Sequence, residues 1–282
     1  MLDTTAKQMI EIQAYKMDGL GNDFIIIDRR KEKIDISKQQ IINIANRKQG
    51  PGCDQVILID KDKEKKTNAK ITFYNSDGGE TGACGNGSRC ISYFLMNEKK
   101  LNKSKINTES GILNAKLTGK TEVSVDMGVP NFDWQKIPLA KKMNHAKVMI
   151  KTKTFGILSG YTLSIGNPHI IFFKNITFEL LKKIGPQIEH HEFFPQRCNV
   201  TFAEVMNKKN IAVKVWERGA GLTLACGTAA CATAVAANKL GLTGKKVNIH
   251  FKNGTLQIEW AKNKHIIMTG SVSNINNISL KI

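Results

Sequence analysis

The stretch "NSDGGETGACGNGSRC", residues 75–90, places a cysteine inside a glycine-rich turn. A second stretch, "ERGAGLTLACGTAACA" at residues 217–232, repeats the tripeptide Ala-Cys-Gly in a similar setting. Each tripeptide follows a glycine-bearing lead-in and precedes a segment with the composition of a helix. A single turn of this kind before a helix is typical of a phosphate-binding loop. Two of them in one chain predict two similar halves, each with a cysteine at the start of a helix.

Short apolar runs with β-branched residues recur along the chain and predict strands. They lie at residues 24–28, 55–60, 70–75, 122–128, 147–152, 161–174, 210–219, 247–251, 255–260 and 265–270. Helices are expected at residues 37–50, 85–100, 178–185 and 227–241. The first of these helices has a capping box formed by Ser37 and Gln40 and a closing glycine. The pattern predicts an α+β protein, and residues 127–138, which contain two prolines, are the best place for its boundary.

The chain of 282 residues, 41% of them hydrophobic, is long enough for one large domain or two ordinary ones. No apolar run approaches the roughly 18–20 residues that span a bilayer. The N-terminus lacks a basic start followed by an apolar stretch, so no secretory signal is expected. We therefore expect a cytoplasmic protein without a membrane partner.

The six cysteines stand at positions 53, 84, 90, 198, 226 and 231. In a long chain without a secretory signal, reduced thiols are favoured over disulfides. The sequence has neither a Cys-x-x-Cys motif nor a Cys/His cluster with zinc-finger spacing. We expect no metal. A lone cysteine is most often a small buried hydrophobic residue, and this interpretation is given to Cys53, Cys90, Cys198 and Cys231.

The formal net charge of +18 raises the question of nucleic-acid binding. The lysines are spread in small groups and are not interleaved with aromatic residues, so a solvated basic surface is the favoured interpretation. No nucleic-acid partner is expected. Attraction of an anionic small molecule is compatible with the same charge.

The two turn cysteines suit acid/base chemistry. The N-terminus of a helix stabilises an anion, so the pKa of each thiol is expected to fall toward neutrality. Two such thiols facing each other across a cleft could remove a proton from one face of a carbon and deliver a proton to the other face. Inversion at an α-carbon is such a reaction. Acyl transfer would need a single cysteine beside a His/Asn pair, and redox chemistry would favour two cysteines close in sequence.

Several motifs, in order, resemble those of the diaminopimelate epimerase family over residues 12–270. The quoted motifs are "KMDGLGNDFIIID" (16–28), "GPGCDQVILI" (50–59), "YNSDGGETGACGNGSRC" (74–90), "SIGNPHIIFF" (164–173), "FFPQRCNVTF" (193–202) and "WERGAGLTLACGTAACA" (216–232). The resemblance implies that Cys84 and Cys226 are catalytic and that His169 and Glu217 modulate their pKa. The substrate-binding residues that it implies are Asn22, Gln55, Asn75, Gly85, Asn86, Asn167, Asn199, Glu217, Arg218, Gly227 and Thr228.

The family interconverts L,L-2,6-diaminopimelate and meso-diaminopimelate by a two-base mechanism, in lysine and peptidoglycan precursor biosynthesis. The resemblance therefore implies a pyridoxal-phosphate-independent isomerase that needs neither an organic cofactor nor a metal. It also implies two pseudo-symmetric domains, each a mostly antiparallel sheet wrapped around a central helix, with the active site in the cleft between them. The final strand returns to the first domain. The expected halves are residues 1–128 plus 271–282, carrying Cys84, and residues 129–270, carrying Cys226.

Four features depart from the family pattern. Position 18 is Asp where the family often has His, and "GTAA" stands where "GTGA" is commoner. About eleven residues precede the first matching strand. The C-terminal end lacks the late aromatic that helps to form a homodimer in the family, and Asn276 stands near its place. A homodimer is possible by analogy with the family, but the atypical C-terminal end leaves the oligomeric state open.

Three other functions compete with this interpretation. Another cofactor-independent epimerase or racemase of the same fold, acting on proline derivatives or histidine, would be expected to depart at "ERGAG" or "CGNG". A non-catalytic binding protein for a basic or dicarboxylic amino acid would need neither thiol. A nucleic-acid-binding role would show itself as salt-dependent binding to random DNA or RNA.

Overall fold

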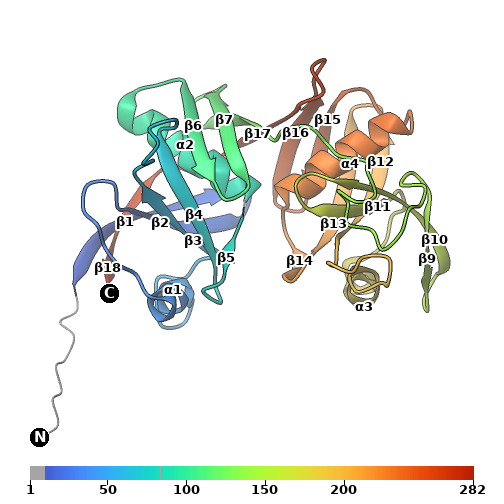
Figure 1. Cartoon of the computed structure of the whole chain (residues 1–282), viewed down its shortest axis with the longest axis horizontal. Coiled ribbons are helices and arrows are strands. Elements are labelled where there is room, and N and C mark those ends of the chain that lie inside the picture. The colour runs from blue at the N-terminus through green and yellow to red at the C-terminus, as the bar shows by residue number, and fades with distance from the viewer. Residues whose placement is uncertain (1–9, 83) are drawn as a thin grey trace, which may run out of the picture. The chain divides into compact units, whose positions relative to one another are not determined.

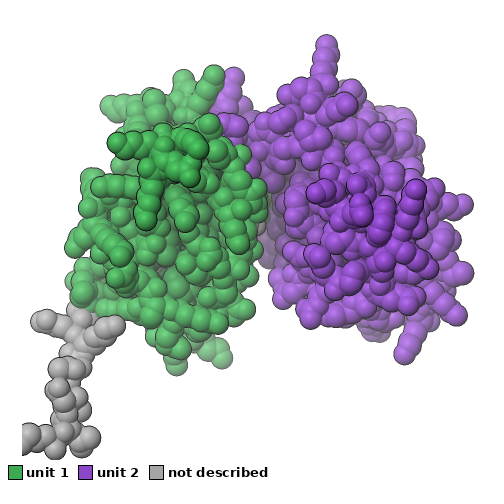
Figure 2. Space-filling model, viewed as in Figure 1, with its two compact units in different colours: residues 1–112, 272–282 green, residues 113–271 purple. Residues whose placement is uncertain are grey.

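The computed structural model describes residues 10–82 and 84–282. The chain divides into two compact units, residues 1–112 with 272–282 and residues 113–271 (Figure 2). The first nine residues of the expected N-terminal extension, and Ala83 of the first Ala-Cys-Gly tripeptide, lie outside the described residues. Within the described ranges, none of the helices is long and apolar enough to cross a membrane.

The first unit is a mixed sheet built around one helix. Its strands are β1 (Glu11–Gly19), β2 (Asn22–Asp28), β3 (Gln55–Asp60), β4 (Ala69–Asn75), β5 (Glu80–Thr81), β6 (Lys103–Thr108) and β18 (Asn276–Lys281). They pair in the order β18–β1–β2–β3–β4–β6, with β2–β3 and β4–β6 parallel and the other pairs antiparallel. Because β18 pairs with β1, the end of the chain returns to the first unit, as the resemblance implied.

Two helices cover the two faces of this sheet (Figure 1). The central helix, α2 (Gly85–Lys99), is buried throughout residues 85–92. A Cβ atom at Gly87 would lie 2.8 Å from a ring carbon of Phe73, so only glycine lets the helix approach β4 this closely. The second helix, α1 (Lys38–Ala45), buries Ile41, Ile44 and Ala45 in an apolar cluster on the other side of the sheet.

The sequence predicted the start of α1 correctly and its end incorrectly. The Ser37 hydroxyl accepts the Gln40 N–H at 3.3 Å and Gln40 Oε1 accepts the Ser37 N–H at 2.8 Å, which confirms the capping box. The helix ends at Ala45 rather than near Gly50. Asn46 leaves the helical conformation, and the following residues form turns in which the Gly50 N–H donates to the Asn46 carbonyl at 2.9 Å.

The second unit contains the larger sheet. Its strands are β8 (Glu122–Asp126), β9 (Val148–Thr152), β10 (Gly156–Ser164), β11 (Pro168–Phe172), β12 (Asn199–Asn207), β13 (Asn210–Glu217), β14 (Gly221–Thr223), β15 (Lys246–Phe251), β16 (Gly254–Trp260) and β17 (Ile266–Ser271). The pairing order is β9–β10–β11–β12–β13–β15–β16–β17–β8, with β11–β12 and β13–β15 parallel. A further strand, β7 (Gly111–Leu117), crosses the boundary between the units and pairs with β8.

The two units share one topology. The antiparallel pair β1–β2 is followed by a parallel step to β3, an antiparallel step to β4 and a parallel step to β6. The same succession leads from β10 through β11, β12 and β13 to β15. Helix α3 (Phe178–Glu189) lies between β11 and β12 as α1 lies between β2 and β3, and α4 (Gly227–Lys239) precedes β15 as α2 precedes β6. The predicted α+β fold with two repeated halves is confirmed.

The central helix of the second unit is α4, buried throughout residues 229–237. It contacts β10, β11, β12, β15, β16 and β17. Because the side chains of this buried stretch are mostly alanine, strands can pack closely against it on several sides. Helix α3 covers the other face, where Leu181, Ile184 and Ile188 join an apolar cluster with strand residues. It continues to Glu189, past the predicted end at Gly185 and through Pro186.

The compact units do not divide at residues 128/129. Residues 113–128 belong to the second unit, because β8 pairs along its length with β17, from Asp126 opposite Ile267 to Glu122 opposite Ser271. The first unit holds Cys84 and the second holds Cys226.

Candidate active site

Cys84 is the N-cap residue of α2, with φ −135° and ψ 114°. Its sulfur accepts the Gly87 backbone N–H at 3.4 Å, and its thiol donates to Asn22 Oδ1 at 3.7 Å. Gly85 is the first residue of the helix and is buried. The half-buried thiol therefore faces the N-terminal end of the helix on one side and an amide oxygen on the other.

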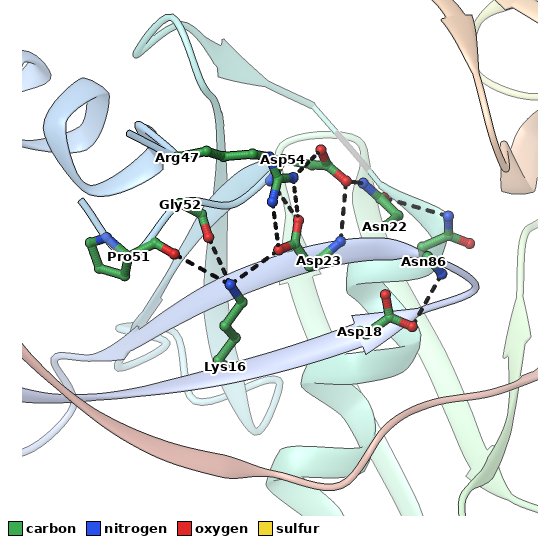
Figure 3. A network of polar contacts seen from close by, with 10 residues as sticks. Lys16, Asp18, Asn22, Asp23, Arg47, Pro51, Gly52, Asp54 and Asn86 are labelled. Carbon is green, nitrogen blue, oxygen red and sulfur yellow. Dashed lines mark hydrogen bonds and ion pairs between the residues drawn. The ribbon is translucent and has the colours of Figure 1, made fainter. Parts of the chain in front are cut away.

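Asn22 is held from both ends of its amide (Figure 3). Its nitrogen donates to Asp54 Oδ2 at 2.8 Å, and its oxygen accepts from Asn86 Nδ2 at 3.5 Å. Asp54 is bonded in turn to Arg47 Nη2 at 2.7 Å. Asp18 accepts the Gly21 backbone N–H at 3.1 Å, within the turn that leads from β1 to β2. The aspartate that departs from the family pattern directly precedes Gly19, where an added Cβ atom would lie 3.4 Å from the Cβ atom of Asn86 at the start of α2.

Arg47 joins two carboxylates in this network. It donates to both oxygens of Asp23, at 3.0 and 2.7 Å, and to Asp54. Burial alone would raise the pKa of Asp23, but the hydrogen bonds and charge of Arg47 lower it below the usual value. Lys16 also contacts Asp23, at 3.3 Å. The sequence analysis missed this supporting network, although Asp54 directly precedes Gln55 in the motif "GPGCDQVILI".

Gln55 and Asn75 occupy the same edge of the sheet as Asn22. They are opposite each other on β3 and β4, and Gln55 Nε2 donates to Asn75 Oδ1 at 2.9 Å. Among the described residues, the buried Gln55 Oε1 has no hydrogen-bond partner. An acceptor left unpaired at this depth is costly unless a ligand or water satisfies it. The first unit therefore groups its predicted site residues in two hydrogen-bonded sets, Gln55 with Asn75, and Asn22 with Cys84 and Asn86.

Cys226 repeats the geometry of Cys84 in the second unit. It is the N-cap residue of α4, with φ −139° and ψ 113°. Its sulfur lies 3.5 Å from the Thr228 hydroxyl, and its exposed fraction is only 5%. Gly227 follows as the first, buried helical residue. The prediction of a cysteine at the start of each central helix is confirmed.

The predicted lowering of the pKa is wrong for Cys226. Burial and the nearby Glu217 carboxylate raise the pKa of this thiol well above its ordinary value, and hydrogen bonds from Thr228 and the start of α4 oppose the rise. Burial also raises the pKa of Glu217, while Thr223 and Cys226 beside it act in the opposite direction. The helix dipole is therefore outweighed here by desolvation and by a like charge.

His169 lies behind this second turn and is fully buried. Its Nε2 lies 2.8 Å from Asn167 Oδ1, so Nε2 carries the proton that the amide oxygen accepts. Asn167 Nδ2 then donates to the Thr228 hydroxyl at 3.3 Å. Burial, and to a lesser extent the charge of Arg218, lowers the pKa of His169 to about 3, so its ring is neutral. Among the described residues, the buried Nδ1 has no partner.

Asn199 and Arg218 complete the second group. Asn199 is buried, and its amide donates to the Pro168 carbonyl and accepts the Arg218 backbone N–H, both at 3.0 Å. The Arg218 side chain is exposed and donates to the Gln196 carbonyl at 3.3 Å. Asn199 thus orients the backbone that carries Arg218, which leaves the guanidinium free to meet an anion.

The described residues include no group of three or more His, Cys, Asp or Glu side chains arranged to hold a metal ion. In the part of the chain that the structure describes, none of the six cysteines forms a disulfide. Both cysteine turns consist of thiols, amides and helix N–H groups, a set suited to binding carboxylates and moving protons.

The fold is shared with an epimerase of known structure. A hydroxyproline epimerase from Agrobacterium vitis has a TM-score of 0.69 at 12% sequence identity, with 96% of this chain and 93% of that chain covered. At this identity the likeness concerns the fold alone.

The sequence comparisons identify the family more closely than the fold does. The diaminopimelate epimerase family model matches residues 14–132 and 161–275. A diaminopimelate epimerase from Pelagibacter ubique is 48% identical over 280 residues, covering 97% of this chain and 100% of the relative. One from Caulobacter vibrioides is 43% identical over 269 residues, covering 92% and 93%. The chain therefore belongs to the diaminopimelate epimerase family.

Proposed function

We propose that this protein is a diaminopimelate epimerase, an isomerase that interconverts L,L-2,6-diaminopimelate and meso-diaminopimelate for lysine and peptidoglycan precursor biosynthesis. The observation that carries the proposal is the pair of cysteines with nearly the same backbone geometry, each capping the buried central helix of one unit. A protein that only binds an amino acid needs neither thiol. Family membership supplies the substrate.

The reaction moves one proton off the α-carbon and places another on its opposite face. One cysteine, as thiolate, takes the α-proton, and the electron pair left on carbon is stabilised by the adjacent carboxylate. The other cysteine, as thiol, gives its proton to the other face of that carbon. The enzyme is left with the two protonation states exchanged.

The raised pKa of Cys226 supports a protonated thiol at this position in the free enzyme. Cys84 lies in a different setting, because it is half-buried and contacts the Asn22 amide oxygen, whereas Cys226 is 5% exposed and lies near the Glu217 carboxylate. Two like groups with unlike surroundings suit a two-base reaction, because one must begin as base and the other as acid.

The helix starts and amides suit a substrate with two amino-acid centres. The N–H groups beyond Gly85 and Gly227, with Asn86 and Thr228, are placed to bind the carboxylate at the reacting centre. Asn22, Asn75 and Gln55 in one unit, and Asn167, Asn199 and Arg218 in the other, are proposed to bind the distal ammonium and carboxylate. His169 and Glu217 adjust the protonation of the thiols.

We further propose a cytoplasmic enzyme that can form a homodimer and has no nucleic-acid partner. Reduced thiols suit the cytoplasm, because both cysteines must be free to carry protons. Light scattering on the purified chain would measure the oligomeric state, and a monomer at working concentrations would exclude the dimer.

The test is proton exchange during turnover. L,L-diaminopimelate incubated with the enzyme in D₂O should give meso-diaminopimelate with deuterium at the inverted α-carbon. Proline, hydroxyproline and histidine serve as control substrates, since another epimerase of this fold would act on one of them. Epimerisation without deuterium entry would overturn the two-base mechanism, and turnover of a control substrate alone would overturn the assigned substrate.

A further inference from the structure

Glu189 is a buried acidic residue that the proposed mechanism does not use. It is the last residue of α3, and only 3% of its surface is exposed. The C-terminal end of a helix carries partial negative charge, so a carboxylate is unfavourable there. Among the described residues, it forms a long ion pair with Nη1 of the half-exposed Arg197, at 4.0 Å. A buried carboxylate without a close ion pair costs stability, and its retention needs another reason.

Both oxygens of this carboxylate accept hydrogen bonds from the segment that carries Glu217 and Arg218. Oε2 accepts the indole N–H of Trp216 at 2.7 Å, and Oε1 accepts the backbone N–H of Gly219 at 2.9 Å. Trp216 and Gly219 are the residues immediately before and after the Glu217–Arg218 pair. The carboxylate thus holds both ends of a short segment that lies 27–30 residues further along the chain.

The segment is the tight turn between β13 and β14. Trp216 is opposite Leu222, and Glu217 is opposite Gly221. Gly219 and Gly221 have φ values of 76° and 81°, a conformation that other residues rarely adopt. The Ala220 N–H donates to the Glu217 carbonyl at 3.2 Å. A turn this short has few backbone hydrogen bonds of its own. The two hydrogen bonds to Glu189 therefore contribute much to fixing its conformation.

Helix α3 also fixes the indole itself. A Cβ atom at Gly185 would lie 2.6 Å from Cγ and Cδ2 of Trp216, so the ring packs directly on the helix backbone. Gly185 and Glu189 are one helical turn apart and meet the same indole, one by packing and one by a hydrogen bond. The turn is therefore attached to a rigid helix rather than only to its own hairpin.

We propose that Glu189 is a positioning residue of the reaction, whose carboxylate fixes the 216–219 turn so that Glu217 faces Cys226 and Arg218 faces the substrate. This inference rests on the proposed function for its substrate, and on the geometry alone for its effect on the turn. It explains why a costly buried charge stands at the end of α3.

Glu189→Gln is the first test. Glutamine has one acceptor oxygen, so one of the two donors would face its NH₂ group. The variant should lose about tenfold or more in kcat/KM, mainly through a higher KM as Arg218 loses its orientation. Its Cys226 should be alkylated faster by iodoacetamide than in the wild type, because the displaced Glu217 no longer disfavours the thiolate. Alkylation is followed by mass spectrometry of the Cys226 peptide.

A second substitution tests whether the two donors cause the defect. In Glu189→Gln combined with Trp216→Phe, the indole donor is absent and the glutamine oxygen can still accept from Gly219. The double variant should therefore recover about threefold or more in kcat/KM over Glu189→Gln alone. Glu179→Gln is the matched control, since it removes an exposed acidic residue from the first turn of the same helix and should leave both readouts unchanged.

Each outcome decides the proposal. Wild-type KM and Cys226 reactivity in Glu189→Gln would overturn it. If that variant does not fold, Trp216→Phe alone decides, because it keeps the carboxylate and deletes one bond. A KM and Cys226 reactivity equal to those of the wild type in Trp216→Phe would then overturn the proposal. Absence of diaminopimelate turnover in the wild type would instead refute the proposed function, while the alkylation measurement would still test the role of Glu189.

Discussion

Asn22 donates its side-chain N–H to Asp54 Oδ2 at 2.8 Å, and this bond determines which end of the amide faces Cys84. With the nitrogen held by a carboxylate, the oxygen is the end that meets the Cys84 thiol, at 3.7 Å. Arg47 holds Asp54 in turn, at 2.7 Å. The orientation of a residue at the proposed active site therefore depends on an ion pair outside it.

Asp54→Ala should weaken catalysis more than it weakens the fold. Asn22 would be free to rotate its amide, so kcat/KM should fall by about tenfold. Asp54 and Arg47 are exposed, so the free energy of unfolding should change by no more than about 1 kcal/mol. Steady-state kinetics and urea unfolding measure the two effects.

The matched control for Asp54 is Asp60→Ala. Asp60 lies at the other end of β3 and pairs with Arg29 at 2.6 Å. Its loss should cost similar stability and leave kcat/KM unchanged. Equal kinetic losses in the two variants would show that Asp54 acts only through stability.

Replacing either turn cysteine should abolish turnover. Cys84→Ala and Cys226→Ala each remove one of the two proton carriers, and a loss of about a thousandfold or more in kcat is expected. Cys90→Ala is the control, because Cys90 is fully buried in α2 and burial raises the pKa of its thiol. Epimerisation retained by either single variant would contradict the assignment of the thiols.

Glu217→Gln should change the chemistry of Cys226 in a defined direction. The Glu217 carboxylate adds to burial in raising the pKa of this thiol, so its removal should lower that pKa. The alkylation rate of the Cys226 peptide, measured against pH, should reach half its maximum at lower pH than in the wild type. Turnover should fall by about tenfold or more, because the thiol is less firmly held in its protonated form. An upward shift of the alkylation profile would refute the electrostatic role.

The parts of the site that are local in sequence could be predicted, and those that depend on tertiary contacts could not. Cys226 directly precedes a glycine and an alanine-rich segment, and this local pattern predicts a cysteine at the start of a helix. The pKa of Cys226 was predicted in the wrong direction because the helix dipole is visible in the sequence, whereas burial by the sheet is not. The roles of Asp54 and Glu189 depend on partners 32 and 27–30 residues away. Nothing in single-sequence periodicity indicates such pairs.

His169 should make the fold sensitive to acid without appearing in the pH dependence of turnover near neutrality. Burial lowers its pKa to about 3, whereas an unfolded histidine titrates near its ordinary value of 6.5. Between these values the unfolded state binds the extra proton, so the free energy of unfolding is highest above about pH 6.5 and falls as the pH drops toward 3. One proton gives a slope of up to about 1.4 kcal/mol per pH unit.

His169→Gln, whose amide can still donate to Asn167, should show a smaller fall in the free energy of unfolding with decreasing pH, measured by urea unfolding. His190→Gln is the exposed control. Identical slopes for the wild type and His169→Gln would show that the buried ring is not the group responsible.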